Sequence, residues 1–415
     1  MKRNVGPGIA IAIAALAGIL AIGASGNFST NAVNAAAHQH ADSAAPPDSG
    51  SGSEHAGHSA QVTSEPPAPL RAGEHFQAVT LPGGAYTPSA QNGGTDDYRC
   101  FLVDPGIASD SYLTGVQFMP GNPAVVHHAI VYKIDPSQVS AAEQLDQKDP
   151  SRGWSCFGGT MVPQDAHGGI SGALDNAPWL AAWAPGGKES IYRPGMGVPI
   201  AKGAQVVVQI HYNLLNGTGP DNSMLHLRLA PGSPKLTPIS TMLLPAPVEL
   251  PCAPGESGPL CDRAAALSEL TQRFGSQAGM MVGGLQLLCG GDMFNPKSGD
   301  TQSCSRPITK PVNVWASAGH MHLLGKSIKI EVNPGTPNSR TLLDIPNWDF
   351  DNQGAKPFTN PVALNPGDKV RVTCTHDAGL RKNLPAFKNK PARYVMWGEG
   401  TTDEMCLGLL VTTPR

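Results

Sequence analysis

Charge is scarce in this sequence. Lys, Arg, Asp and Glu together account for 15% of the 415 residues, and the formal net charge is -3. A nucleic-acid-binding protein would carry a basic patch or stripe, and this sequence shows neither, so we expect no nucleic-acid partner. Helical periodicity is also rare, with residues 140–147 and 262–274 as the best candidates. No internal sequence repeat is found.

The sequence also has no Cys-x-x-Cys pair, which argues against a zinc ribbon or a thioredoxin-type site. It does have eight cysteines, and an even number in an exported protein favours disulfides, each worth about 2–4 kcal/mol. No cysteine directly follows the apolar N-terminal run, so a lipoprotein anchor is not expected. The eight are Cys100, Cys156, Cys252, Cys261, Cys289, Cys304, Cys374 and Cys406.

The N-terminus has the composition of a targeting segment. Lys2 and Arg3 precede an almost wholly apolar run from about Gly8 to Ala24, and small residues follow it. We therefore interpret residues 1–26 as a secretory signal peptide. The apolar run is also close to the roughly 20 residues that a membrane span needs, so an uncleaved N-terminal anchor is the alternative. Either interpretation predicts an extracytoplasmic protein, secreted or periplasmic.

Residues 27–75 are predicted to form a disordered linker. The segment is rich in Ser, Gly, Ala, Pro and Asp and has no apolar periodicity, so it cannot bury a hydrophobic core. It contains histidines that we interpret as polar filler in preference to weak copper ligands: His38, His40, His55 and His58.

Beyond the linker the pattern is that of short strands, punctuated by abundant Gly (48) and Pro (39). In Val206–Tyr212 one set of alternate residues is apolar and predicts a core-facing side, while His211 lies on the other side. A Pro-rich passage at about residues 230–251 separates two strand-rich halves. The sequence thus predicts an all-β protein with two jelly-roll-like antiparallel β-sandwich domains in tandem, residues 76–233 and 234–415.

Histidines near two of these predicted strands are candidate metal ligands. His320 and His322 are two residues apart, so on a strand their imidazoles project from the same face. His127 and His128 are adjacent, and adjacent strand residues point to opposite faces. Both can reach one metal only where the strand ends or bulges. Without such an irregularity, one buried and one exposed histidine is the simpler interpretation.

Two further residues are ambiguous by themselves. A lone strand histidine such as His211 is more often a hydrogen-bonded structural residue than a metal ligand. Met405, beside Cys406, would ordinarily belong to core packing. A thioether is nevertheless a soft ligand that favours Cu(I) and suits zinc or magnesium poorly.

Taken together, these segments resemble the ascorbate-dependent type II copper monooxygenases, the family that includes peptidylglycine alpha-hydroxylating monooxygenase and dopamine beta-monooxygenase. Each motif is weak singly, but the motifs occur in the family order across roughly residues 80–412. They are Val126-His127-His128, Gln209-Ile-His211-Tyr212, His320-Met-His322-Leu-Leu-Gly-Lys326 and Asp403-Glu-Met405-Cys406.

The resemblance implies two copper ions that cycle between Cu(I) and Cu(II), and it assigns no catalytic residue beyond their ligands. An electron-transfer copper would be held by His127, His128 and His211, and an oxygen-binding copper by His320, His322 and Met405. The implied reaction is hydroxylation of a C–H bond in a small-molecule substrate. It would use O2 and an external reductant, with ascorbate or another one-electron donor as co-substrate.

The resemblance also bears on the cysteines and on the substrate. It pairs Cys374 with Cys406 and Cys100 with Cys156, and it leaves three possible connectivities for the remaining four cysteines. The peptidylglycine branch has an arginine at the position of Ala318, where it binds the substrate carboxylate, and a tyrosine at the position of Leu409. Without this cation and phenol, we expect a weakly charged or apolar substrate.

Two alternatives belong to other functional classes. An exported copper-binding or copper-storage protein would keep the ligands without hydroxylating anything. A zinc hydrolase would use the three histidines of the first site, since three imidazoles with an open position suit catalytic zinc. That reading leaves His320, His322 and Met405 unexplained.

Overall fold

The computed structural model of the protein describes residues 66–415, except residues 91–95, 150, 157, 165–168, 185–186, 215–216 and 351. The predicted signal segment, most of the predicted linker and the linker histidines lie outside the described residues. Within the described part of the chain, no helix combines the length and apolar character needed to cross a membrane.

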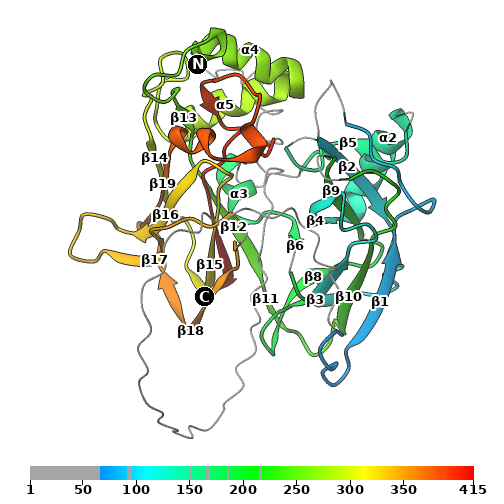
Figure 1. Ribbon diagram of the computed structural model, residues 1–415. Helices are drawn as coiled ribbons and strands as arrows, with labels where there is room; N and C mark the ends of the chain where they lie inside the picture. Colours follow the sequence, from blue (N-terminus) through cyan, green and yellow to red (C-terminus); the bar gives the residue numbers. More distant parts are fainter. Residues whose placement is uncertain are drawn as a thin grey trace, which may run out of the picture.

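The first half of the described chain forms two facing sheets, which are antiparallel except for the parallel pair β8–β11 (Figure 1). One has the order β1-β10-β3-β8-β11 with β7 paired to β3, and the other has the order β5-β2-β9-β4-β6. The strands are β1 (His75–Thr80), β2 (Asp96–Val103), β3 (Ser111–Met119), β4 (Val126–Ile134), β5 (Trp154–Ser155), β6 (Trp179–Trp183), β7 (Ser190–Ile191), β8 (Met196–Ile200), β9 (Gln205–Asn213), β10 (Met224–Pro231) and β11 (Thr237–Pro238). The helices here are η1 (Pro136–Gln138), α2 (Val139–Lys148) and α3 (Gly169–Asp175).

The second half forms another pair of antiparallel sheets, β12-β21-β15-β18 and β14-β19-β16-β17, and a small β13-β20 ribbon. The strands are β12 (Ser240–Pro245), β13 (Glu249–Leu250), β14 (Thr301–Pro307), β15 (Val312–His320), β16 (Gly325–Val332), β17 (Arg340–Ile345), β18 (Lys356–Leu364), β19 (Lys369–His376), β20 (Val395–Met396) and β21 (Leu407–Pro414). The helices are η2 (Pro259–Cys261), α4 (Arg263–Phe274), α5 (Ser276–Leu288), η3 (Ala378–Lys382) and η4 (Pro385–Phe387). The predicted all-β fold with two sandwiches in tandem is confirmed.

Strand alternation places the two hydrophobic cores. On β9, Val206, Val208 and Ile210 belong to the core between the two N-terminal sheets, as the alternation predicts. The intervening Val207 belongs to a second, larger core that includes the C-terminal sandwich. The side of β9 that carries His211 therefore faces the second half of the molecule, and His211 itself is 1% exposed.

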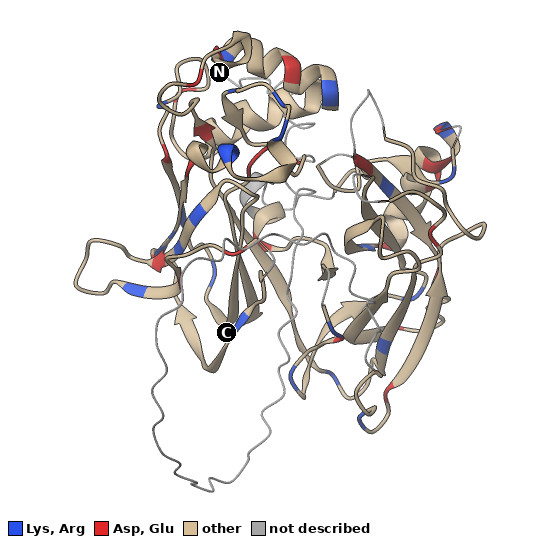
Figure 2. Cartoon of the chain, in the orientation of Figure 1, with Lys and Arg blue, Asp and Glu red and all other residues tan. Residues whose placement is uncertain are grey.

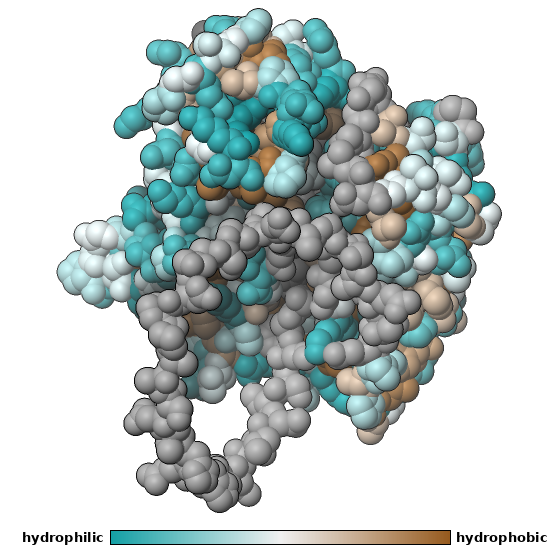
Figure 3. All heavy atoms as spheres, viewed as in Figure 1, coloured by the Kyte–Doolittle hydropathy of each residue, from teal (hydrophilic) through white to brown (hydrophobic). Residues whose placement is uncertain are grey.

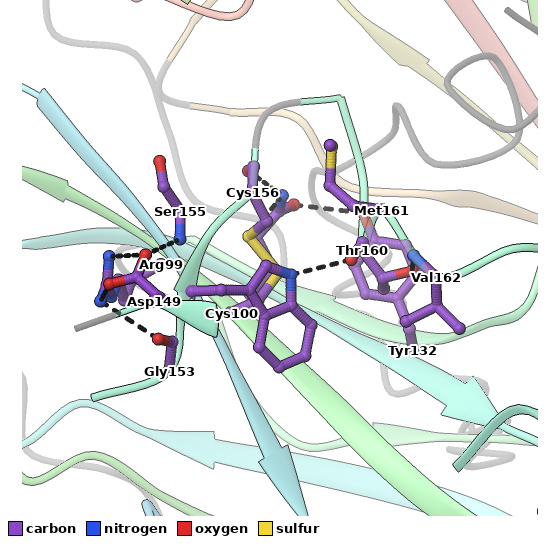
Figure 4. Close-up of a disulfide and its surroundings, with 12 residues drawn as sticks. Arg99, Cys100, Tyr132, Asp149, Gly153, Ser155, Cys156, Thr160, Met161 and Val162 are labelled. Carbon is purple, nitrogen blue, oxygen red and sulfur yellow. Dashed lines mark hydrogen bonds and ion pairs between the residues drawn. A yellow bond between two sulfur atoms is a disulfide. The ribbon is translucent and has the colours of Figure 1, made fainter. Parts of the chain in front are cut away.

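All eight cysteines form disulfides. The two pairs implied by the family resemblance are confirmed, Cys100–Cys156 and Cys374–Cys406. The first lies close to the Arg99–Asp149 ion pair (Figure 4). Trp154 pairs with Cys100 between β5 and β2, and its indole N–H donates to the Thr160 carbonyl. The remaining four cysteines pair as Cys252–Cys261 and Cys289–Cys304. These two disulfides fall before and after the α4–α5 helix pair, and the first of these helices was predicted as residues 262–274.

Several contacts join the halves, which lie side by side in Figure 1. Arg306 of β14 forms an ion pair with Asp175 of α3, and Ala177 makes a β-bridge to Thr241. Charged residues are spread thinly over both halves (Figure 2). On the face shown in Figure 3, the end of the molecule that carries α4 and α5 is mainly hydrophilic, and small hydrophobic patches lie among the hydrophilic residues.

Candidate metal centre

The first cluster of histidines arises from a bulge in β4. Val126 pairs with Tyr212 of β9 and His128 pairs with the adjacent His211, so the register shifts at this point and His127 is the extra residue of the bulge. A bulge turns consecutive side chains away from strict alternation. This is the irregularity that the sequence required for His127 and His128 to reach one metal, and it is confirmed.

The three imidazoles of His127, His128 and His211 converge through their Nδ1 atoms. Each of the three Nδ1–Nδ1 distances is 3.2 Å. A metal–imidazole bond is about 2.0 Å long, so two nitrogens at a tetrahedral angle lie about 3.3 Å apart. The cluster therefore fits one metal ion without rearrangement, and it is a group of side chains able to hold a metal.

The outer side of this cluster fixes the tautomer of His211. Its Nε2 lies 2.8 Å from Asp96 Oδ1, so Nε2 carries the proton and Nδ1 presents a lone pair. Tyr98 stacks on the His211 ring with a centroid distance of 4.1 Å and an interplanar angle of 9°. Burial, followed by His211 and His127, holds the pKa of His128 well below its usual value. Imidazoles whose nitrogen lone pairs converge repel one another unless a cation lies between them.

The second cluster lies at the end of β15. His320 is the last residue of that strand, and His322 follows in the turn that leads to β16. Their ring centroids are 5.0 Å apart, and both side chains are buried. Burial and the adjacent His322 lower the pKa of His320 to about 3, and burial, His211 and His376 lower that of His322 to about 3. Both imidazoles are therefore neutral at physiological pH, which is the form that binds metals.

Hydrogen bonds occupy the Nδ1 atoms of this pair. His320 Nδ1 lies 2.6 Å from Gln353 Oε1, and His322 Nδ1 lies 3.2 Å from the Asp403 carbonyl oxygen. Both partners are acceptors, so each Nδ1 donates a proton and each Nε2 keeps its lone pair. The second cluster thus offers two Nε2 atoms, whereas the first offers three Nδ1 atoms.

The residues that flank Met405 contact this histidine pair. The side chain of Glu404, which is 0% exposed, accepts hydrogen bonds from the backbone N–H of His322 (3.0 Å) and of Leu324 (2.5 Å). Leu407, two residues beyond Met405, pairs with His320 across β21 and β15. Met405 is 5% exposed, and its neighbour Cys406 is cross-linked to Cys374.

An apolar wall adjoins the second cluster. Ala318 pairs directly with Leu409 on β21, and both share the strand face of His320, since alternate residues point the same way. Gly319 and Gly408 lie on the opposite face, where an added Cβ would meet Ile328 and Ile330 at 2.8 Å. That opposite face therefore packs into the C-terminal sandwich, and the His320 face points out of it.

Several residues of these clusters were missed in the sequence. Asp96, Gln353 and Glu404 bind the ligands or their backbone, but they are far from them in sequence or lacked a partner pattern. His376, which showed no pattern, is 1% exposed with Nε2 3.2 Å from the Met405 carbonyl oxygen. The available signal was the acidic Glu404 between an aspartate and the candidate ligand Met405.

Comparison with known families agrees with this geometry. Residues 293–412 match the family model described as copper type II ascorbate-dependent monooxygenase, C-terminal domain. This range contains His320, His322 and Met405. The second half of the chain therefore contains a domain similar to that of the copper type II ascorbate-dependent monooxygenases. No curated protein shows a significant match to the chain.

Solved structures give only weak similarity. The major capsid protein P2 of bacteriophage PM2 matches with a TM-score of 0.29 and 12% identity, over 81% of this chain and 96% of that chain. Allantoicase matches with a TM-score of 0.17 and 8% identity, over 79% and 90%. A fucolectin from striped bass serum matches with a TM-score of 0.15 and 8% identity, over 83% and 97%. Similarity at this level carries no argument about function.

Proposed function

We propose that the protein is an exported copper monooxygenase that hydroxylates a C–H bond of a small, weakly charged or apolar substrate. The observation that carries this proposal is the convergence of three imidazole nitrogens in one half of the molecule. It is accompanied by a second buried histidine pair in the other half, which the residues flanking Met405 contact. When bound, two copper ions supply the one-electron redox chemistry for activating O2. Substrate R–H, O2, two electrons from a donor such as ascorbate and two protons give R–OH and water.

The ligand sets fit copper by their chemistry. We assign His127, His128 and His211 to an electron-transfer copper, because neutral imidazoles accommodate both Cu(I) and Cu(II). We assign His320, His322 and Met405 to the copper at which O2 is used, because a thioether favours Cu(I). Asp96 and Gln353 hold the outer nitrogens of one ligand in each set and keep the inner nitrogens unprotonated.

The wall beside the second ligand set supports the substrate class. Ala318 and Leu409 are 4% and 7% exposed, and neither can form an ion pair or donate a hydrogen bond from its side chain. A substrate carboxylate placed there would be desolvated without a cationic partner, which is unfavourable. The same positions in the peptidylglycine branch carry an arginine and a tyrosine. We therefore propose an apolar or weakly charged substrate and not a C-terminal peptide glycine.

Four disulfides support an oxidising compartment, secreted or periplasmic. With this localisation we propose residues 1–26 as a signal peptide or N-terminal anchor, residues 76–233 as the first copper domain and residues 234–415 as the second. The expected partners are a small-molecule substrate, O2 and a reductant.

Metal analysis of the purified full chain is the first test. About two copper ions per chain and negligible zinc would support the assignment. One zinc ion per chain with an occupied three-histidine site would contradict it and favour a zinc hydrolase.

A substrate screen tests the reaction itself. The copper-loaded protein is supplied with ascorbate, isotopically labelled O2 and a panel running from apolar small molecules to glycine-extended peptides. We expect one labelled oxygen atom in an apolar product, with ascorbate oxidised in proportion. Two bound coppers without any product across the panel would favour copper storage, and comparable turnover of a glycine-extended peptide would contradict the proposed substrate class.

A further inference from the structure

The loop between β17 and β18 contacts both candidate metal sites. At the second site, Trp348 Nε1 donates to the His322 carbonyl oxygen at 3.2 Å, and Gln353 Oε1 lies 2.6 Å from His320 Nδ1. At the first site, Phe350 stacks on the ring of His127, with a centroid distance of 5.9 Å and an interplanar angle of 20°. Three residues of one loop thus contact three candidate ligands in two halves of the molecule.

The orientation of the Gln353 amide follows from its two partners. Its Nε2 lies 2.7 Å from the Phe350 carbonyl oxygen, which can only accept a hydrogen bond. The amide nitrogen therefore faces Phe350 and the amide oxygen faces His320, which leaves His320 Nδ1 as the donor. A single side chain in this way selects the His320 tautomer whose Nε2 is available to a metal.

The first site depends on the same loop for a different reason. His128 and His211 are buried in the sheet, whereas His127 lies on the bulge and is only partly buried. The ring of Phe350 covers His127 from the second half, and the Phe350 backbone is hydrogen-bonded to Gln353. The three contacts form one continuous series from the His127 ring through Phe350 and Gln353 to His320.

We infer that the β17–β18 loop couples the two metal sites, with Gln353 and Phe350 as positioning residues, so that metal at the first site strengthens binding at the second. The inference rests on the proposed function in so far as both sites bind copper. Metal binding at the first site would fix His127 and with it Phe350 and Gln353. The cost of ordering this loop would then already be met when the second metal binds to His320. By linkage, the second metal strengthens the first to the same degree.

The coupling can be measured as a ratio of affinities in the full chain. The affinity of the second site for Cu(I) is determined anaerobically against a chromophoric chelator, with the first site intact and with it removed by His128→Ala. This substitution leaves the contact between His127 and Phe350 in place. We expect the second site to bind at least about fivefold more weakly when the first is removed.

Substitutions in the loop separate positioning from coupling. Gln353→Ala removes the acceptor for His320 and should weaken the second site by about 10–100-fold. Gln353→Glu keeps an acceptor oxygen for His320 but loses the donor to Phe350, so the second site should stay within about threefold of the parent while the fivefold coupling disappears. Phe350→Leu should also abolish the coupling. The matched control is Asn352→Ala, an exposed residue of the same loop, which should preserve it.

A spectroscopic measurement accompanies the affinities. The Cu(II) electron paramagnetic resonance signal of the second site should change in Gln353→Ala and recover in Gln353→Glu. Thermal unfolding confirms that each variant is folded, and Phe350→Leu, at a partly exposed position, serves if Gln353→Ala does not fold. If the parent protein binds two copper ions but the second site has the same copper affinity with and without the first site, the inference is wrong and the proposed function still stands. Coupling that persists in both Gln353→Glu and Phe350→Leu would also overturn the inference alone. Fewer than two coppers in the parent protein would overturn the proposed function and this inference together.

Discussion

The two candidate metal sites are built in different ways. The three-histidine site takes its ligands from the neighbouring strands β4 and β9 of one sheet, and a single bulge brings the three nitrogens to equal 3.2 Å separations. The second site combines the end of β15 with the segment before β21, and these meet through the buried Glu404 carboxylate. One site is preformed by sheet register, and the other depends on a hydrogen-bonded clamp.

This difference has a consequence for how each site fails. The three-histidine site is positioned by the register of two paired strands and is therefore supported by many backbone hydrogen bonds. No single side chain that is hydrogen-bonded to one of its ligands should be essential to it. The second site depends on the hydrogen bonds of one buried carboxylate, that of Glu404. Removing a partner from a buried charged or polar group lowers the free energy of unfolding substantially. The following predictions, from the largest effect to the smallest, test whether the two sites really differ in this respect.

The largest effect is expected from removing a ligand of either site. His320→Ala and His128→Ala should each lose one copper and keep the other, because the two ligand sets share no residue. Turnover should fall by more than about a thousandfold in both variants. Metal content and product formation are measured on the same preparations. Retained turnover in His320→Ala would show that the oxygen site has been wrongly assigned.

Disulfide removal compares the halves at the level of stability. Cys374→Ser with Cys406→Ser opens a bridge with a sequence separation of 32, and Cys100→Ser with Cys156→Ser one of 56. Either pair should lower the free energy of unfolding by about 4 kcal/mol in a denaturant titration. Weaker copper binding at the second site is expected only in the first pair, since Cys406 adjoins Met405. Equal effects of both pairs on that site would contradict this.

Substitution of the outer carboxylates compares the sites directly. Glu404→Gln places an amide N–H₂ group against backbone donors and should cost about 2–3 kcal/mol of unfolding free energy and about 10–100-fold in second-site copper affinity. Asp96→Asn still offers an oxygen to His211 Nε2, so the first site should weaken by less than about tenfold. Glu331→Gln, in a half-exposed ion pair with Arg371, is the control for carboxylate loss in the same sandwich. A larger effect at Asp96 than at Glu404 would reverse the comparison.

The smallest effect concerns pH and Glu399, whose carbonyl oxygen accepts the Tyr98 hydroxyl across the two halves. Burial raises the pKa of Glu399 from 4.5 to about 8, although the backbone N–H of Gly158 opposes the shift. The folded protein therefore binds a proton that the unfolded chain has lost, and stability falls as pH rises from about 4.5 to 8. Glu399→Gln should remove this loss of stability. The free energy of unfolding of the variant should therefore exceed that of the parent by more than about 1 kcal/mol at pH 8 but not at pH 4.5. Chemical unfolding of both proteins at both pH values measures this difference. The same pH dependence of the unfolding free energy in parent and variant would contradict the raised pKa of Glu399.

The sequence could predict the strands and the six candidate ligands, because strand alternation and short motifs are local. The alternation of Val206–Tyr212 correctly placed one core, and the adjacent pair His127 and His128 required the bulge that is present. Helix α4 was recognised from its apolar stripe. Helix α5 was missed, since it is apolar on several sides and lacks a clear helical period.

The supporting residues could not be predicted, because their partners are distant in sequence. Arg228 shares a face of β10 with His226, and arginine is seldom fully buried. Arg228 is in fact 0% exposed, because residues before β1 cover it and it forms ion pairs with Glu74 and Glu189. Gln353 likewise lies in a loop without a motif, and only the folded arrangement brings its amide to His320.

The pairing of Ala318 with Leu409 has a consequence for how substrate range can diverge. Ala318 lies two residues before His320 on β15, and Leu409 lies two residues after Leu407, the strand partner of His320, on β21. Main-chain hydrogen bonds set the register of these two strands. A larger or more polar side chain at either position would reshape the wall while leaving the ligand geometry in place. Under the proposed function, a new specificity would therefore require few substitutions, because the residues that recognise the substrate and the residues that bind the metal are neighbours but not the same.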